Sequence, residues 1–158
     1  MNEFSEKFMK EAIRLSMENI QNGHGGPFGA VIVMDGKIIS KSENKVIQKN
    51  DPTAHAEIEA IRIASKKLNN FNLKECVIYT SCEPCPMCLS AIYWARIKKI
   101  YYANTRKDAA DILFDDEHIY NEFSIPHSER KIPMIQHSRD EAIKVFKAWE
   151  KKTDKIRY

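Results

Sequence analysis

Hydrophobic residues recur with two different periods along the first part of the chain, and each period predicts a different element. Residues 5–22 carry apolar side chains at helical spacing, and Gly23 provides a stop signal. Residues 29–44 form two β-rich runs joined by Asp35-Gly36, a pair typical of tight hairpin turns. A helix followed by a β-hairpin is therefore expected at the start of the fold.

Helices and strands then alternate through the rest of the chain. The expected elements are a well-buried helix at 54–68, a strand at 76–80, a helix at 86–96, a strand at 98–104, a helix near 115–123, a short apolar segment at 132–136 and a helix from about 140. This alternation after an opening hairpin predicts an α/β fold, in which a mixed sheet has helices on both faces. No internal repeat or linker interrupts the pattern, so residues 1–158 are expected to form a single domain.

The composition narrows the choice of functions. With 43% hydrophobic and 30% charged residues, the chain of 158 residues is typical of a soluble globular protein. A net charge of +3 is too small to predict a nucleic-acid partner. No apolar run is long enough for a membrane span and the N-terminus does not resemble a signal peptide, so a cytoplasmic location without membrane contact is expected.

Cysteines crowd into the stretch "TSCEPCPMCLSAIYWAR", where Cys82, Cys85 and Cys88 follow at three-residue steps. In the reducing cytoplasm such a cluster favours metal binding over a disulfide. An iron-sulfur run would continue with a fourth cysteine and a proline, which do not follow Cys88. A closed structural zinc site could use all three cysteines and His55, whereas a catalytic zinc would use His55, Cys85 and Cys88 and leave one position for water.

A second motif favours the catalytic zinc. His55 and Glu57 lie two residues apart where a helix is expected to begin, and a structural zinc site has no use for that carboxylate. His-x-Glu followed by Pro-Cys-x-x-Cys is the signature of zinc-dependent base deaminases, in which the glutamate carries protons and is not a ligand. Both halves are present, the second at residues 84–88. On this interpretation Cys76 and Cys82 are ordinary buried residues.

Together, these motifs resemble the cytidine-deaminase-like zinc hydrolases, and within them the members that deaminate guanine. The resemblance covers nearly the whole chain and is carried by "GGPFGAVIV", "NDPTAHAE", "YTSCEPCPMCLSAIYWAR" and "FDDEHIY". It implies a three-layer α/β/α fold with a mixed five-stranded sheet, one Zn²⁺ per subunit and the hydrolysis of guanine to xanthine and ammonia. After residues 101–104 the chain departs from the pattern of tRNA-adenosine deaminases, which argues against a tRNA substrate.

The resemblance also implies roles for individual residues and a mode of assembly. Glu57 and Asp116 would be catalytic, and the substrate-binding residues would be Phe28, Asn44, Ala56, Trp94, Asp116 and Tyr158. The implied partners are a small purine base and a second copy of the chain, with the C-terminal segment 131–158 exchanged between the subunits of a homodimer. Deamination of tRNA adenosine or of another base or nucleoside, and a non-catalytic structural zinc module, are the alternatives that the sequence leaves open.

Overall fold

The computed structural model describes residues 4–114 and 116–157. The chain divides into two compact units, residues 1–117 and 118–158. The helices of the first unit are α1 (Glu6–Gln21), α2 (Val46–Lys49), α3 (Ala56–Leu68), α4 (Pro86–Trp94) and α5 (Arg106–Asp111), and its strands are β1 (Gly29–Met34), β2 (Lys37–Glu43), β3 (Val77–Cys82) and β4 (Lys99–Asn104).

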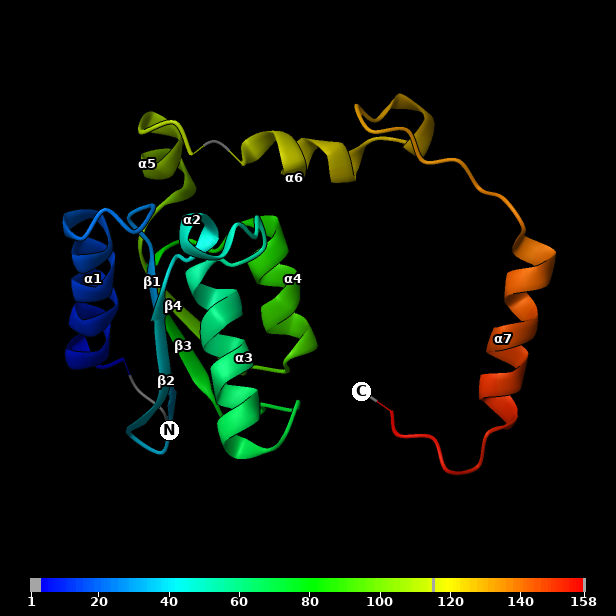
Figure 1. Cartoon of the computed structure of the whole chain (residues 1–158), viewed down its shortest axis with the longest axis horizontal. Helices are drawn as coiled ribbons and strands as arrows, with labels where there is room; N and C mark the ends of the chain where they lie inside the picture. Colours follow the sequence, from blue (N-terminus) through cyan, green and yellow to red (C-terminus); the bar gives the residue numbers. More distant parts are fainter. Residues whose placement is uncertain (1–3, 115, 158) are drawn as a thin grey trace. The chain divides into compact units, whose positions relative to one another are not determined.

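The strands of the first unit form one mixed sheet in the order β2-β1-β3-β4 (Figure 1). β1 pairs antiparallel with β2 and with β3, whereas β3 and β4 run parallel. The predicted hairpin is present, because Asp35 and Gly36 both adopt positive φ, as a tight two-residue hairpin turn requires. α4 forms the crossover from β3 to β4, and the starts of α3 and α4 lie at the same end of the sheet (Figure 1).

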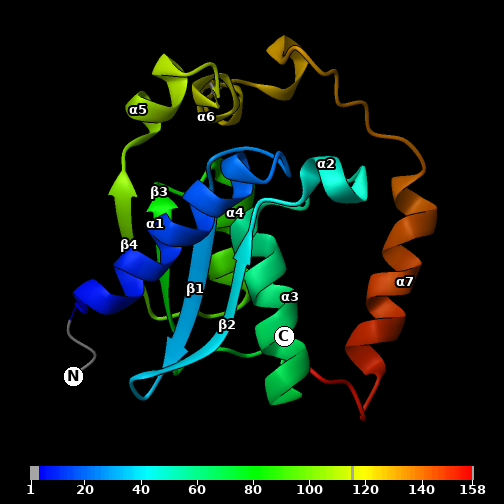
Figure 2. The same ribbon diagram turned by 60° about the vertical axis from the view of Figure 1, so that its left-hand side comes forward.

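Alternating side chains of β1 face two separate helical layers. Val31 and Val33 pack with α1, in a cluster that includes Phe8, Ala12 and Leu15. Ala30 and Ile32 point to the other face, where α3 and α4 contribute Ala56, Ala60, Ala64 and Ile92. Figure 2 shows α1 in front of the sheet and α3 and α4 behind it. This confirms the predicted three-layer α/β arrangement. Separately, no described helix has both the length and the apolarity to cross a membrane.

One part of the predicted fold is wrong: the described residues form a four-stranded sheet, not a five-stranded one. Directly after β4, Thr105 caps α5 through a reciprocal bond with Asp108, which turns the chain into a helix. The apolar segment 132–136 forms no strand, and its Ile132 and Ile135 side chains are exposed. Pro133 within it has no N–H to donate to a strand ladder.

The remaining elements carry the chain into the second unit. They are α6 (Glu117–Ser124), the short 3-10 helix η1 (His127–Glu129) and α7 (Arg139–Lys151). Within this unit the Lys131 backbone N–H donates to the Glu122 carboxylate, which fixes the connection after α6. No described residue of α7 is buried, and its large apolar side chains are exposed.

Candidate active site

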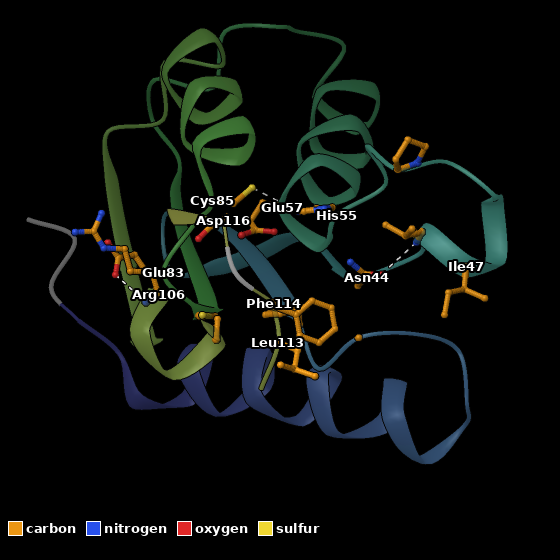
Figure 3. A pocket seen from close by; sticks show the side chains of 16 residues that line it. Asn44, Ile47, His55, Glu57, Glu83, Cys85, Arg106, Leu113, Phe114 and Asp116 are labelled. Atoms are coloured by element: carbon orange, nitrogen blue, oxygen red, sulfur yellow. Dashed lines mark hydrogen bonds between the residues drawn. The ribbon is translucent and has the colours of Figure 1, made fainter. Parts of the chain in front are cut away.

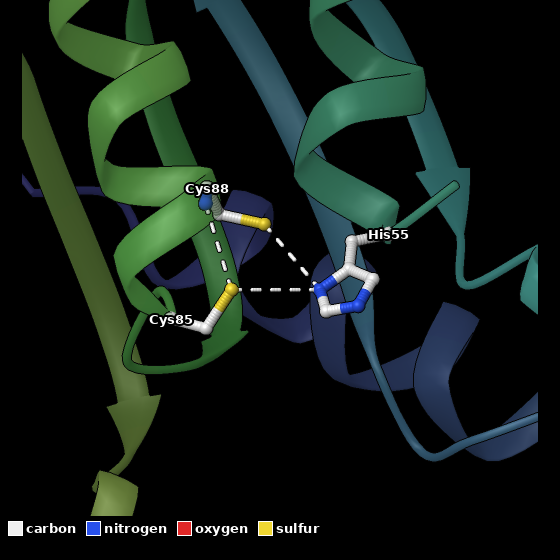
Figure 4. A group of neighbouring side chains, drawn as sticks. All are labelled: His55, Cys85 and Cys88. Atoms are coloured by element: carbon white, nitrogen blue, oxygen red, sulfur yellow. Dashed lines mark hydrogen bonds between the residues drawn. The ribbon is translucent and has the colours of Figure 1, made fainter. Parts of the chain in front are cut away.

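The metal ligands predicted from the sequence lie together at the starts of two helices. His55 is the N-cap of α3, Cys85 is the N-cap of α4, and Cys88 lies in the first turn of α4. The His55 Nδ1 atom is 3.6 Å from the Cys85 Sγ and 3.5 Å from the Cys88 Sγ. Figure 4 shows the two sulfur atoms facing the same ring nitrogen. A single ion could therefore contact all three atoms.

These distances fit a tetrahedral zinc ion. With Zn–S bonds of about 2.3 Å and Zn–N bonds of about 2.0–2.1 Å, tetrahedral angles place a sulfur and a nitrogen ligand about 3.6 Å apart. The donor atoms of His55, Cys85 and Cys88 all lie within 4.8 Å of one another. The Cys82 thiol instead donates to the Thr105 carbonyl at 3.5 Å. Three protein donors leave a fourth zinc position open, as catalytic zinc requires.

The surroundings of the thiols favour metal binding. The Cys88 backbone N–H donates to the Cys85 Sγ at 3.5 Å, so the N-terminus of α4 stabilises a thiolate there. The Cys88 side chain, and after it His55, lowers the pKa of Cys85 to about 4, although burial opposes this shift. The Cys85 contact and burial raise the pKa of Cys88. Zinc binding would therefore release protons, with Cys88 as a source.

Glu57 lies in the first turn of α3, two residues after His55, and is buried, with 8% of its surface exposed. Burial is the largest cause of its raised pKa. Figure 3 shows its carboxylate beside His55 and Cys85, pointing into the pocket. A raised pKa favours the protonated form of a buried carboxylate, and such a carboxylate beside a metal site is suited to accept and pass on protons as a general acid-base group.

A cavity of about 460 Å³ opens above this cluster. Its wall is formed entirely by the first unit. The lining residues are Gly26, Phe28, Asn44, Val46, Ile47, Pro52, His55, Glu57, Cys82, Glu83, Cys85, Arg106, Ala109, Leu113, Phe114 and Asp116. The cavity thus combines a largely apolar wall with a small number of polar groups, as small-molecule sites do.

Two predicted substrate-binding residues, Phe28 and Asn44, line this cavity. The Phe28 ring contacts the Phe114 ring edge to face, with the centroids 4.9 Å apart. Asn44 is buried at the end of β2, and its Oδ1 atom accepts the Val46 backbone N–H at 3.2 Å. Because the amide oxygen is used in this way, the amide N–H groups of Asn44 are the ones suited to acceptors on a ligand.

The structure places the other predicted site residues unevenly. Asp116 lines the cavity. The pKa of His55 is raised chiefly by its contact with Cys85, and the charge of Asp116 adds to this shift. Ala56 is fully buried as the first residue of α3. Trp94 lies at the end of α4, is 64% exposed and does not line the cavity. Tyr158 lies outside the described residues. The binding roles of Trp94 and Tyr158 stay predictions.

Several cavity residues were missed by the sequence analysis. Phe114 and Leu113 form part of the wall, and Leu113 adopts φ +71° in the turn after α5. Ile47 comes from the short helix α2, which the sequence pattern did not predict. Phe114 begins the stretch "FDDEHIY", so the motif was visible although the role of its first residue was not.

Comparisons with known proteins agree with this geometry. Residues 2–104 match the family described as the cytidine and deoxycytidylate deaminase zinc-binding region. Guanine deaminase of Bacillus subtilis is 52% identical over 97% of this chain and 98% of its own length. A tRNA-specific adenosine deaminase of Aquifex aeolicus is 33% identical over 93% of this chain and 94% of its own length.

The solved structures repeat this pattern. The X-ray structure of the Bacillus subtilis guanine deaminase matches with a TM-score of 0.95 at 51% identity, covering 99% of both chains. Guanine deaminase from Nitrosomonas europaea matches with a TM-score of 0.67 at 30% identity, covering 72% of this chain and 65% of its own. The similarity to the Bacillus subtilis guanine deaminase therefore extends along nearly the whole chain, in sequence and in structure.

Proposed function

The chain belongs to the cytidine and deoxycytidylate deaminase family of zinc-binding enzymes, and we propose that it hydrolyses guanine to xanthine and ammonia. One observation carries this proposal. A single cavity brings together three zinc ligands, the buried Glu57 carboxylate and the side chains of Phe28 and Asn44. The whole-chain similarity to the Bacillus subtilis enzyme supports guanine as the base.

The chain's own residues can perform the proton transfers. A zinc ion bound by His55, Cys85 and Cys88 would lower the pKa of water toward about 7 and so supply hydroxide at neutral pH. Glu57 accepts the proton released from that water and passes it to a ring nitrogen of guanine. Oxygen adds at C2, the carbon that bears the exocyclic amine. The proton of the added hydroxyl group then moves to the exocyclic amine by way of Glu57, with Asp116 placed in the same cavity to assist this second proton transfer, and loss of ammonia leaves xanthine.

The part of the cavity lined by Phe28 and Asn44 would hold the base. The flat Phe28 ring suits stacking on a purine, and the N–H groups of the Asn44 amide suit the acceptors on its edge. Ala56 presents its backbone N–H at the start of α3, where a helix favours partial negative charge. By the family resemblance, Trp94 and Tyr158 would complete the contacts with the base.

The direct test is ammonia release from a panel of substrates by the zinc-loaded protein. Guanine, guanosine, adenine, cytosine and a tRNA carrying the target adenosine are compared, and xanthine is identified as the product by chromatography. Guanine is expected to give the highest kcat/KM. A higher value with tRNA would favour the reaction named for the Aquifex aeolicus relative. Full zinc loading without deamination of any substrate would favour a structural zinc module.

We propose further that the protein is a cytoplasmic homodimer that exchanges residues 131–158 between its subunits. All four cysteines are free, which suits a reducing compartment. The α7 helix exposes Val145, Phe146 and Trp149 on an apolar face that a second copy of the chain could cover. Pro126 and Pro133 enclose residues 127–132 in the connection between α6 and α7, where a hinge would lie.

Exchange can be tested by mixing two inactive chains. One carries Glu57→Gln, and the other lacks the C-terminal Tyr158. In a mixed dimer with exchanged segments, the Glu57 of the truncated chain meets an intact tail from its partner, so activity returns. Without exchange no site in the mixture holds both groups, and the mixture stays inactive. Light scattering on each protein checks that the dimer forms.

A further inference from the structure

A buried amide outside the cavity connects the two segments that carry the purine-binding wall. Asn19 lies in α1 and has only 1% of its surface exposed. Its Nδ2 atom donates to the Gly26 carbonyl at 2.8 Å and to the Asn44 carbonyl at 3.0 Å. One side chain of the outer helix thus fixes the loop before β1 to the end of β2.

Further hydrogen bonds extend this connection to Phe28. The Asn44 backbone N–H donates to the Phe28 carbonyl at 3.0 Å, and the Phe28 N–H donates to the Gly26 carbonyl at 2.8 Å. Both carbonyls held by Asn19 therefore belong to the same small network as Phe28. A displacement of the Asn19 amide would be transmitted through this network to the Asn44 side chain and to the Phe28 ring.

The network is also tightly packed on its third side. A Cβ atom at Gly25 would lie 3.2 Å from the Asn44 Oδ1 and 3.3 Å from the Asn19 Nδ2. Both distances are shorter than ordinary van der Waals contact, so even one methyl group would press on both amides. The position of Asn44 is therefore determined by close neighbours as well as by hydrogen bonds.

An asparagine at position 19 would be unfavourable for stability if the side chain served only to fill space in the core. Its Oδ1 atom is buried and has no hydrogen-bond partner among the described residues. A buried acceptor without a partner destabilises a fold, and such atoms are rare in proteins. The benefit that offsets this cost lies in the Nδ2 bonds, which end on the segments of Phe28 and Asn44.

We propose that Asn19 is a positioning residue for purine recognition, which sets the direction in which the Asn44 amide and the Phe28 ring face the cavity. The inference rests on the proposed function, because it takes Asn44 and Phe28 as the residues that bind the base. Asn19 itself lies behind the cavity wall and touches neither the metal site nor the space for the base. It acts through its two carbonyl partners.

The test compares Asn19→Asp, Asn19→Ala and a control, Asn22→Ala. Asn19→Asp keeps the shape of the side chain but replaces both donors by an oxygen that faces two carbonyls. Asn22 is an exposed asparagine just after the same helix. Both Asn19 variants are expected to raise KM for guanine about tenfold, as loss of an aligned hydrogen bond does. Zinc content and kcat should stay within about twofold, and Asn22→Ala should match the wild type.

A double-mutant cycle separates positioning from general destabilisation. Because Asn19 would position both Asn44 and Phe28, adding Asn19→Asp to Asn44→Ala should raise KM by clearly less than the roughly tenfold increase expected in the wild-type background, since one of the two positioned groups is already gone. Equal effects of Asn19→Asp in both backgrounds would overturn the proposal. So would an unchanged KM in a folded, zinc-loaded Asn19 variant.

Two further measurements cover the remaining outcomes. If the Asn19 variants do not fold, Gly25→Ala presses on the same amides while keeping them, and it should raise KM in the same way. If the wild type does not deaminate guanine, the proposed function fails, and positioning is then read from the side-chain amide resonances of Asn44 in the zinc-loaded protein. Asn19→Asp should shift these resonances and Asn22→Ala should not. Unshifted resonances would overturn the inference.

Discussion

The two sides of the cavity are built in different ways. The metal wall, which comprises His55, Glu57, Cys85 and Cys88, stands on the first turns of α3 and α4. The recognition wall, which comprises Phe28, Asn44, Leu113 and Phe114, stands on loops and strand ends. Helices packed against a sheet hold the first wall. The Phe28 and Asn44 segments of the second wall are joined by hydrogen bonds from Asn19 on α1 to the Gly26 and Asn44 carbonyls.

This difference separates chemistry from affinity. On the proposed mechanism, the metal wall would supply a hydroxide source and a proton carrier, which act mainly in the transition state. The recognition wall would contact the base both before and during the reaction, so it would contribute mainly to KM. Substitutions in the metal wall should therefore mainly lower kcat, whereas substitutions in the recognition wall should mainly raise KM.

The largest effect is expected from Cys88→Ala in the metal wall. Removing one of three protein ligands should lower zinc content well below one ion per chain and reduce ammonia release to background. The measurements are metal analysis and a coupled ammonia assay. Cys76→Ala is the matched control, because Cys76 is also a buried free cysteine but lies outside the ligand cluster. Full activity in Cys88→Ala without bound metal would contradict the assignment.

Glu57→Gln sharpens the comparison within the metal wall, because it removes the proton carrier and keeps the metal. Loss of general acid-base catalysis should lower kcat by about 10² to 10⁴-fold, while zinc content stays at one ion per chain. Glu59→Gln is the control, since Glu59 is a second buried glutamate on α3 whose carboxylate bonds Lys49 and Arg62 instead. An active Glu57→Gln variant would refute the mechanism.

The metal wall could be predicted from the sequence, and the reason is local. His55 and Glu57 share one helix start, and Cys85 and Cys88 share another, so short spacings determine most of the geometry. The Asp35-Gly36 hairpin and the three layers followed in the same way from patterns within a few residues of one another.

The recognition wall could be predicted only in part, because its contacts join distant segments. Phe28 and Asn44 came from a family resemblance, and no spacing rule brings Phe114 against Phe28 across the fold. Asn19 was missed because an asparagine in an amphipathic helix is usually solvated, whereas this one is buried. The fifth strand was expected from the resemblance alone, whereas the capping of α5 by Thr105 makes the chain helical directly after β4.

Asn44→Ala probes the recognition wall with a smaller expected effect. Loss of the amide N–H groups should raise KM for guanine about tenfold and leave kcat within a few-fold, because a neutral hydrogen bond contributes about 1 kcal/mol. Steady-state kinetics with guanine measures both constants. Asn50→Ala serves as the control, since Asn50 is an exposed asparagine just after α2. A kcat loss as large as that of Glu57→Gln would show that the two walls are not separate.

The smallest effect on catalysis is expected from Glu59→Gln, which tests whether the metal wall depends on its surroundings. Burial alone would raise the pKa of Glu59, but hydrogen bonds from Lys49 and Arg62 outweigh it and lower the pKa below 4.5. A lowered folded-state pKa stabilises the fold above pH 4.5, and this contribution is lost as the pH falls through the folded-state value. Since Lys49 and Arg62 are half exposed, the variant should lose about 1 to 2 kcal/mol at pH 7.

Chemical denaturation at pH 7 and at pH 4 measures this contribution, and the difference between Glu59→Gln and the wild type should shrink at the lower pH. Glu6→Gln is the matched control, because its pair with Lys10 on α1 is largely exposed and should contribute less than about 0.5 kcal/mol. If Glu59→Gln also lowered kcat, the ion pairs around α3 would belong to the machinery of the metal wall. An unchanged kcat with reduced stability would show that the first turn of α3 holds His55 and Glu57 in place by packing against the sheet.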